Sequence, residues 1–136
     1  MRELGIGPWV EFTGRIGSED LVRHYARAAA AVVPSLYEGF GLPAGEAMAC
    51  GVPVISTTGG ALPEVVGDAG LLVPPGDPAA LAAAIRRVLD RPDYSRALGQ
   101  RGRERVGLTF TWRRAAERTV SVYREAIDAH RRLRPA

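Results

Sequence analysis

The chain has 136 residues, of which 46% are hydrophobic and 24% are charged, and its formal net charge is +3. This length allows one domain but not two, since domains commonly run to about 100–200 residues. The single cysteine, Cys50, excludes an intramolecular disulfide, and the two histidines, His24 and His130, show no spacing typical of metal ligands. The longest apolar run, residues 79–85, has seven residues, whereas a membrane-spanning helix needs about 20. We therefore expect a globular protein of the cytoplasm.

The charge is divided unevenly along the chain. All 18 basic residues are arginine, and residues 1–95 carry a net charge of −4 whereas residues 96–136 carry +7. Such an asymmetry indicates an anionic partner or, more often, the solvated face of surface helices. Aromatic residues are sparse in the basic half, and Trp112 and Tyr123 are expected to face the core, so we expect no nucleic-acid partner. A peripheral contact of the arginines with the inner face of an anionic membrane stays an open alternative.

The first part of the chain alternates between β-forming and helix-forming segments. Residues 9–13 are rich in β-formers and end at Gly14, which predicts a strand. Ser18 is suited to cap a helix in which Leu21, Tyr25 and Ala28 recur at spacings of four and three, which indicates that this face packs inward. Residues 30–33 form a continuous apolar run that Pro34 ends, which is typical of a buried parallel strand.

The later elements continue this alternation. We expect, in order, a helix at 44–50 opened by Pro43, a strand at 52–56, a helical turn at 63–66, a strand at 70–73, a helix capped by Asp77 with Pro78 at its first position, a helix from about Pro92, and a helix at 111–133. On the last helix, four residues share a face that is expected to pack inward: Ala116, Val120, Tyr123 and Ile127. Alternating strands and helices predict an α/β fold with a parallel sheet.

A glycine-rich turn carries the strongest functional signal. The segment Glu38-Gly39-Phe40-Gly41-Leu42 lies between a buried strand and a helix, at the carboxyl edge of the sheet, where open α/β folds bind ligands. Glycine allows close backbone approach and unusual dihedral angles. The free N–H groups of the first helical turn, together with the helix dipole, form an anion site. The sequence therefore predicts that a phosphate or diphosphate binds here.

Two carboxylates, Glu38 and Glu46, flank this turn. Because a carboxylate repels phosphate, we interpret both as hydrogen-bond acceptors for the hydroxyls of a sugar or ribose. A glycosidase-type acid/base pair is a weaker alternative, since simple hydrolysis has no use for a phosphate site between the two groups. A structural interpretation also stays open, with Glu46 as a partner of the helix dipole and Glu38 as a turn residue.

These residues belong to a longer pattern that resembles a known family. Pro34-Ser35, followed by Glu38-Gly-Phe-Gly-Leu-Pro-x-x-Glu46-Ala-Met-Ala-x-Gly-x-Pro-Val-Ile55, is similar to the donor-site signature of retaining glycosyltransferases of GT-B fold, in the glycosyltransferase group 1 family. Further similar segments are Val10-Glu-Phe-Thr-Gly14, Gly59-Gly-x-x-Pro-Glu64, Gly67-Asp-Ala-Gly-Leu-Leu-Val73 and Phe110-Thr-Trp112. The resemblance covers nearly the whole chain.

The resemblance implies a fold and an activity. The fold is a Rossmann-like parallel sheet with flanking helices, the C-terminal part of a GT-B donor domain. The activity is that of a hexosyltransferase, which moves a sugar from a nucleotide-diphosphate sugar to an acceptor sugar or lipid-linked acceptor with retention of anomeric configuration. The nucleotide sugar is a substrate, and neither a cofactor nor a metal is implied. In agreement, the sequence has no Asp-x-Asp pair suited to a divalent cation.

The resemblance also implies residue roles. Glu38 takes the catalytic position and contacts hydroxyls of the donor sugar. Four substrate-binding positions, Gly39, Phe40, Gly41 and Leu42, cradle the sugar and the distal phosphate through their backbone N–H groups. Glu46 accepts hydrogen bonds from the ribose. Gly14 and Arg15 lie near the nucleobase, with a solvated turn residue as the alternative interpretation of Arg15. Gly60 and Glu64 either shape the donor pocket or are plain loop and turn residues. Gly45 departs from the family pattern, which has a bulky apolar residue there, and we interpret it as tolerated variation.

By the same resemblance, residues 1–136 form a partial domain. The N-terminal acceptor domain is missing, as are the first two strands of the donor domain and the Arg and Lys that neutralise the diphosphate. With the strand order 3-2-1-4-5-6, the missing strands would separate residues 9–13 from residues 30–33, so that these two strands close up or an edge stays open. We therefore expect the isolated chain to be inactive. The alternative is a non-catalytic nucleotide-sugar-binding or assembly module that pairs with a separate acceptor-domain chain.

Overall fold

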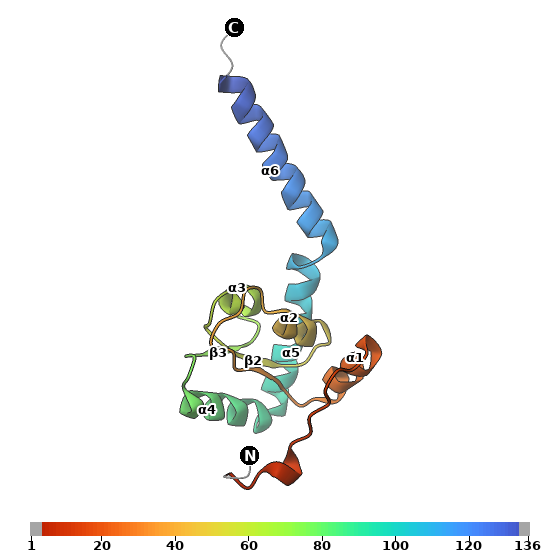
Figure 1. The fold of residues 1–136 in the computed structure, drawn as a ribbon, viewed down its shortest axis with the longest axis vertical. Coiled ribbons are helices and arrows are strands. Elements are labelled where there is room, and N and C mark those ends of the chain that lie inside the picture. Colours follow the sequence, from red (N-terminus) through yellow and green to blue (C-terminus); the bar gives the residue numbers. More distant parts are fainter. Residues whose placement is uncertain (1–3, 134–136) are drawn as a thin grey trace.

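Three short parallel strands form the sheet (Figure 1). They are β1 (Ala31–Val33), β2 (Val54–Thr57) and β3 (Leu71–Val73), in the order β1-β2-β3. Ala31 lies opposite Val54, and Ile55 lies opposite Leu71. The structure is a computed structural model that describes residues 4–133. It confirms the expected α/β class, because helices separate the strands along the chain.

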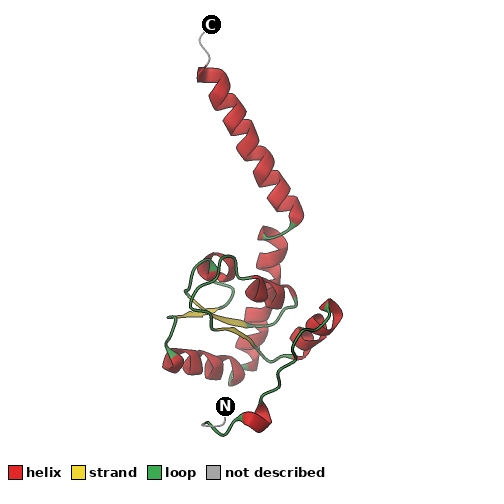
Figure 2. Cartoon of the chain, in the orientation of Figure 1, coloured by secondary structure: helices red, strands yellow, loops and turns green. Residues whose placement is uncertain are grey.

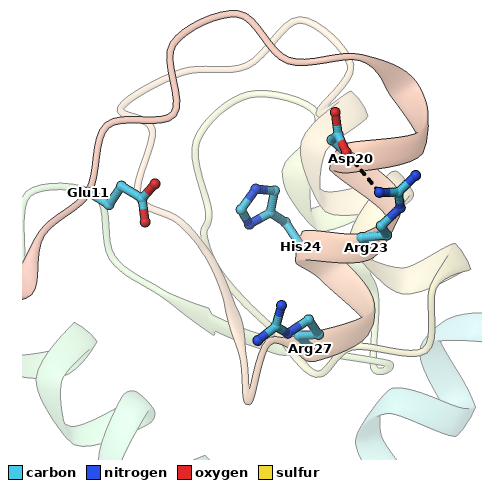
Figure 3. A pocket seen from close by; sticks show the side chains of 5 residues that line it. All are labelled: Glu11, Asp20, Arg23, His24 and Arg27. Atoms are coloured by element: carbon cyan, nitrogen blue, oxygen red, sulfur yellow. Dashed lines mark ion pairs between the residues drawn. The ribbon is translucent and has the colours of Figure 1, made fainter.

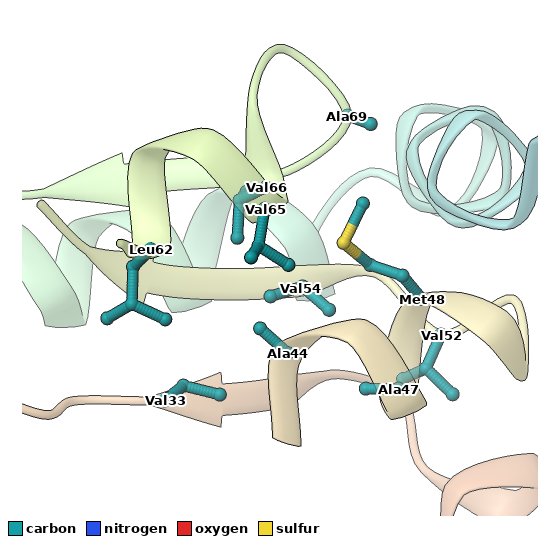
Figure 4. Packing of buried hydrophobic residues seen from close by; sticks show 10 residues of the cluster. All are labelled: Val33, Ala44, Ala47, Met48, Val52, Val54, Leu62, Val65, Val66 and Ala69. Atoms are coloured by element: carbon teal, nitrogen blue, oxygen red, sulfur yellow. The ribbon is translucent and has the colours of Figure 1, made fainter. Parts of the chain in front are cut away.

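Helices cover both faces of the sheet (Figure 2). The helices are α1 (Ser18–Arg27), α2 (Leu42–Ala49), α3 (Leu62–Val66), α4 (Pro78–Leu89), α5 (Pro92–Thr109) and α6 (Trp112–Leu133). On one face, α2 and α3 pack on the strands through a cluster of buried side chains that includes Met48 and Val54 (Figure 4). On the other face, α4 and α5 pack through a second cluster that includes Ile55, Val88 and Leu98.

The two clusters follow from the alternation of side chains along β2. Val54 and Ile55 are neighbours in the sequence, yet each belongs to a different cluster, because successive strand residues point to opposite faces. Both side chains are fully buried, and each such burial contributes about 1.5–3 kcal/mol to folding. The loops at the end of β2 are therefore attached to a well-packed strand.

The helix ends follow the sequence signals closely. The Asp77 carboxylate accepts a 2.9 Å hydrogen bond from the N–H of Ala80, and Pro78 is the first residue of α4, as predicted. The predicted start of α5 at Pro92 is also confirmed. α1 differs by one residue, because Ser18 is its first residue and Gly17 is its N-cap.

The prediction of a strand at residues 9–13 is wrong. A short 3-10 helix, η1 (Gly7–Trp9), occupies its first residue, and residues 10–13 pair with no strand in the described part of the chain. Trp9 is 86% exposed, and Figure 1 shows this segment away from the sheet. A β-rich sequence forms a strand only where a neighbouring strand takes up its N–H and C=O groups. Between residues 4 and 133, no such neighbouring strand lies alongside this segment.

α6 projects away from the sheet and from the helices that cover it (Figure 1). The inward packing predicted for one of its faces is therefore wrong: Tyr123 is 65% exposed, and Val120 and Ile127 are exposed as well. Trp112, also expected to face the core, is 89% exposed. The apolar pattern is present, but no other element between residues 4 and 133 packs along the helix.

The remaining two expectations concern the sheet edge and the membrane. Among the residues that the structure describes, β1 pairs only with β2, so its outer edge is open, which is one of the two arrangements predicted. No helix in the same range is both long and apolar enough to cross a membrane. A peripheral membrane contact of the arginines stays a prediction.

Candidate functional site

The loops that follow β1 and β2 meet at the carboxyl edge of the sheet. The hydroxyl of Thr57, the last residue of β2, donates a hydrogen bond to the carbonyl of Ser35, two residues after β1. The same hydroxyl accepts one from the N–H of Gly59 at 3.3 Å. A cavity of about 190 Å³ opens at this edge, and its lining includes Pro34, Thr57 and Val73, at or just after the ends of the three strands. Parallel pairing thus brings these loops together, as the fold class predicts.

Glu38 is fixed through both its side chain and its backbone. The Ser35 hydroxyl donates a 2.8 Å hydrogen bond to Oε1 of the half-buried Glu38 carboxylate. The N–H of Ala61 donates a 2.9 Å bond to the Glu38 carbonyl. A Cβ at Gly60 would lie 2.3 Å from that carbonyl oxygen, so only glycine fits there. Within residues 4–133, Oε2 of Glu38 has no hydrogen-bond partner and is free to accept from a ligand.

The glycine turn leads directly into α2. Gly41, the N-cap of α2, has φ of 90°, a conformation that L side chains rarely adopt, and a Cβ there would lie 2.8 Å from Leu62 Cδ2. In the described part of the chain, the backbone N–H groups of Gly39, Phe40, Gly41 and Leu42 donate to no protein acceptor. The turn therefore offers a row of four donors at the N-terminus of a helix.

Glu46 lies on the exposed side of α2, one turn after Leu42. The Tyr25 hydroxyl, from α1, lies 3.5 Å from Glu46 Oε2 and 3.3 Å from the carbonyl of Pro43. Burial raises the pKa of Tyr25, and the nearby Glu46 carboxylate raises it further, because both disfavour a second negative charge. The Tyr25 hydroxyl therefore stays protonated and serves as a donor beside Glu46.

The structure places the predicted site residues in two groups. Glu38, the glycine turn and Glu46 lie together on the β1–α2 connection and α2. Gly14 and Arg15 lie before α1, and between residues 4 and 133 no hydrogen bond joins either of them to the glycine turn. The predicted closeness of Gly14 and Arg15 to a nucleobase stays a prediction.

Three further positions in this region were singled out from the sequence. Gly60 packs against Glu38 and so shapes the site directly. Glu64 is exposed on α3, and its backbone carbonyl accepts a 2.7 Å hydrogen bond from Arg105. A Cβ at Gly45 would contact only Val65, at 3.9 Å, so glycine is not required at this departure from the family pattern.

A second, separate pocket lies between the N-terminal segment and α1 (Figure 3). It has a volume of about 430 Å³ and is lined by charged or titratable side chains: Glu11, Asp20, Arg23, His24 and Arg27. Asp20 and Arg23 form an ion pair of 3.3 Å along the helix. All five side chains belong to exposed residues, and none of the predicted site residues lines the pocket in the described part of the chain. We assign it no part in the site.

Sequence reasoning missed three residues that contact the site. Ser35 is part of the quoted motif, but its bond to Glu38 depends on how the loop folds. Tyr25 was assigned only to the packed face of its helix, whereas its hydroxyl reaches Glu46. Phe110 lies 70 residues from Phe40, and their rings meet with centroids 6.0 Å apart. The one signal that could have identified Tyr25 is its hydroxyl, because a polar group on a helix face that is predicted to pack inward needs a hydrogen-bond partner.

In the part of the chain that the structure describes, the titratable residues do not form a metal centre. Within residues 4–133, no group of three or more His, Cys, Asp or Glu side chains could hold a metal ion. The expectation that the reaction needs no metal stays a prediction.

Comparison with known proteins identifies the family. The family described as "Glycosyl transferases group 1" matches residues 1–91. The chain is similar to an MMP alpha-(1->4)-mannosyltransferase of Mycolicibacterium hassiacum, with 47% identity over 92% of this chain and 31% of that protein. It is also similar to a D-inositol 3-phosphate glycosyltransferase of Saccharomonospora viridis, with 44% identity over 95% of this chain and 30% of that protein. The chain thus spans about a third of the length of these curated relatives.

Solved structures give the same result. A sucrose-phosphate synthase from Thermosynechococcus elongatus aligns with a TM-score of 0.83 and 46% identity, covering 94% of this chain and 33% of that one. The C-terminal domain of a glycosyl transferase group 1 family protein from Francisella tularensis aligns with a TM-score of 0.72 and 31% identity, covering 82% of this chain and 58% of that one. The chain therefore belongs to the glycosyl transferases group 1 family, a family of glycosyltransferase enzymes.

Proposed function

We propose that this chain forms part of the donor site of an enzyme that transfers a hexose from a nucleotide-diphosphate sugar to an acceptor hydroxyl with retention of configuration. One observation carries the proposal: the four unpartnered N–H groups from Gly39 to Leu42 directly follow the fixed carboxylate of Glu38. The N–H groups suit the negative charge of a diphosphate, and the carboxylate suits sugar hydroxyls. A sugar joined to a diphosphate has both features in this order.

In this proposal Glu38 is the catalytic residue. Its free Oε2 accepts hydrogen bonds from donor-sugar hydroxyls and holds the anomeric carbon toward the acceptor. The acceptor oxygen bonds to that carbon on the face from which the diphosphate leaves, and the acceptor proton passes to a diphosphate oxygen. The N–H groups of the glycine turn stabilise the charge that develops on the leaving diphosphate. These steps need neither a metal nor a cofactor.

The nucleoside half of the donor is assigned to two further places. Glu46 accepts hydrogen bonds from the ribose, and the protonated Tyr25 hydroxyl beside it supports the orientation of its carboxylate. Gly14 and Arg15 lie near the nucleobase. The exposure of Glu46 on α2, one helical turn beyond the glycine turn, supports this division, because the carboxylate is open to a ligand.

We further propose that the 136-residue chain by itself binds the donor without transferring the sugar. The relatives that it matches are about three times as long. We assign an acceptor-binding domain to the part of them that this chain does not match. The acceptor is a sugar or a lipid-linked hydroxyl compound. A non-catalytic module that pairs with a separate acceptor-domain chain is the second candidate, and the open edge of β1 favours it, because an unpaired edge accepts another strand.

Calorimetric titration of the chain with UDP, GDP and ADP and with their sugars tests the donor site. We expect one nucleotide to bind, and Glu46→Ala to weaken that binding about tenfold, which corresponds to about 1.4 kcal/mol. Glu125→Ala is the matched control, because Glu125 is also an exposed helical glutamate that accepts one hydrogen bond from a hydroxyl, that of Ser121.

The outcomes separate the two candidates. Failure of every nucleotide to bind contradicts the donor site. Binding combined with turnover by the isolated chain contradicts the need for an acceptor domain. Binding with turnover only after a separate acceptor-domain chain is added supports the first candidate, whereas stable pairing with that chain without turnover supports the second.

A further inference from the structure

Phe40, in the middle of the glycine turn, meets Phe110 at the junction of α5 and α6. Their ring centroids lie 6.0 Å apart and their planes are 85° apart, which is the edge-to-face arrangement that aromatic pairs prefer. Phe40 is 50% exposed, so its ring is covered on one side only. The contact joins two segments that lie far apart in the sequence, and α5 also packs against α2, which follows the turn.

Phe110 is itself held firmly in place. Its N–H donates a 3.0 Å hydrogen bond to the carbonyl of Val106, and its half-buried ring packs against the cluster between α2, α3 and the sheet. The Arg105 guanidinium lies 6.0 Å from the centroid of the ring. Arg105 also donates to the carbonyls of Val65 at 2.8 Å and Glu64 at 2.7 Å. The end of α5 is thus tied to the end of α3.

The glycine turn, by contrast, has few contacts of its own. Glu38, before it, is fixed by Ser35 and Ala61, and the first turn of α2, after it, is anchored by the buried Ala44. Gly39 and Gly41 have no side chain, and among the described residues no hydrogen bond holds the two peptide groups between the Glu38 carbonyl, bound by Ala61, and the Gly41 carbonyl, bound by Ala44. Within residues 39–41, Phe40 supplies the one side chain through which the rest of the protein can hold this backbone.

We propose that Phe110 is a positioning residue for the glycine turn. Its ring holds the ring of Phe40 and thereby sets the direction of the N–H groups of Phe40 and Gly41, whose peptide groups adjoin the Phe40 Cα. The consequence for donor binding rests on the proposed function, because those N–H groups are assigned to the sugar and the distal phosphate. Phe110 does not touch the donor in this proposal and acts only through Phe40.

Amide resonances in ¹H–¹⁵N spectra of the free chain test the contact without any ligand. We expect Phe110→Ala to shift the amides of Gly39, Phe40 and Gly41, and Phe110→Tyr, which keeps the ring, to restore them. Trp112→Ala is the control, since it removes an exposed aromatic ring two residues away. Phe110→Leu serves in place of the alanine variant if that variant fails to give a folded thermal transition.

Titration of the same variants with the nucleotide sugar that wild type binds tests the consequence. We expect Phe110→Ala to weaken donor binding about three- to tenfold, since an aromatic pair of this kind is worth up to about a factor of ten in an equilibrium constant. Phe40→Ala should weaken binding to a similar degree, and the double variant should add little. Trp112→Ala should change neither measurement.

The amide spectra and the titrations test different parts of the proposal. Unshifted glycine-turn amides in a folded Phe110→Ala variant overturn the positioning role. Shifted amides combined with unchanged donor affinity overturn its consequence for donor binding. If wild type binds no nucleotide sugar at all, the proposed function fails, while the amide shifts of the free chain still decide whether Phe110 positions the turn.

Discussion

The hydroxyl of Ser35 donates a 2.8 Å hydrogen bond to Oε1 of Glu38, three residues further along the same loop. The carbonyl of Ser35 in turn accepts from Thr57, at the end of the neighbouring strand. Ser35 therefore connects the proposed catalytic carboxylate to the sheet. Since only one carboxylate oxygen is used in this way, the other keeps its capacity for a ligand.

Ser35→Ala should weaken donor binding with little effect on stability. The variant removes the bond that orients the Glu38 carboxylate, and we expect the dissociation constant of the nucleotide sugar to rise about tenfold or more, since a hydrogen bond to a charged group is worth about 1.5–3 kcal/mol. Calorimetric titration measures the effect. Ser121→Ala is the matched control, because Ser121 donates a 3.1 Å bond to Glu125 on α6 and lies outside the site. Equal affinities for wild type and Ser35→Ala would contradict the assigned role of Ser35.

Tyr25 should ionise at a higher pH than an ordinary tyrosine, whose pKa is 10.0. Burial raises its pKa first and the Glu46 carboxylate second, so Glu46→Gln should lower the Tyr25 pKa only part of the way toward its ordinary value. Ultraviolet absorbance of tyrosinate follows the titration, and Tyr25→Phe identifies the late component. A titration in which Tyr25→Phe removes no late-ionising group would refute this.

The raised pKa of Tyr25 also makes the free energy of unfolding fall as the pH rises. The folded state holds the Tyr25 proton more tightly than the unfolded state does, so its contribution to stability is complete below pH 10 and is lost as the pH rises through the raised pKa. The free energy of unfolding should therefore fall more steeply above pH 10 in wild type than in Tyr25→Phe. Urea unfolding at several pH values measures the difference, and parallel curves would contradict it.

Local signals in the sequence were sufficient for most elements of the fold. Asp77-Pro78 marks the start of α4, and the apolar runs around Val33 and Val54 mark buried strands, because capping and burial act over a few residues. The prediction of a strand at residues 9–13 and the prediction that α6 packs inward were wrong for the same reason. Their patterns show a capacity to pair or pack, but whether a partner is present depends on other parts of a chain, which a local pattern does not contain.

The same distinction between local and distant contacts separates the site residues that the sequence predicts from those that it does not. The glycine turn and the two carboxylates were found because their spacing reflects one strand–turn–helix unit. The bonds of Ser35 and Tyr25 to those carboxylates, and the contact of Phe110 with Phe40, depend on loop conformation and on packing between distant segments. Spacing in the sequence contains neither, so the side chains that support the site emerge only from the fold.

The apolar face of α6 should be dispensable for the stability of the sheet. Ile127 is exposed and has no packing partner within residues 4–133, so Ile127→Ser should leave the free energy of unfolding within about 0.5 kcal/mol of wild type. Leu98→Ala, which empties a fully buried position in the second cluster, should cost about 2–5 kcal/mol. Urea unfolding followed by circular dichroism compares the two. A large loss in Ile127→Ser would mean that α6 packs on another part of the protein.

Gly60→Ala should disrupt the site and the fold together. Gly60 has φ of 63°, and a Cβ there would lie 2.3 Å from the Glu38 carbonyl oxygen and 2.9 Å from the Glu38 nitrogen. Both neighbours are backbone atoms, which cannot move aside as a flexible side chain would. We expect a loss of about 2–4 kcal/mol in the free energy of unfolding, together with weaker donor binding, because the loop that carries Glu38 must shift.

Gly107→Ala is the matched control for this glycine substitution. Gly107 lies within α5, and a Cβ there would meet nothing within 4 Å. Alanine is the better helix former by about 0.5–1 kcal/mol, so this variant should be more stable than wild type. Urea unfolding of the two variants should therefore give changes of opposite sign. If Gly60→Ala were as stable as wild type, the loops after β1 and β2 would not pack as closely as described, and the fixed position of Glu38 would have to be abandoned.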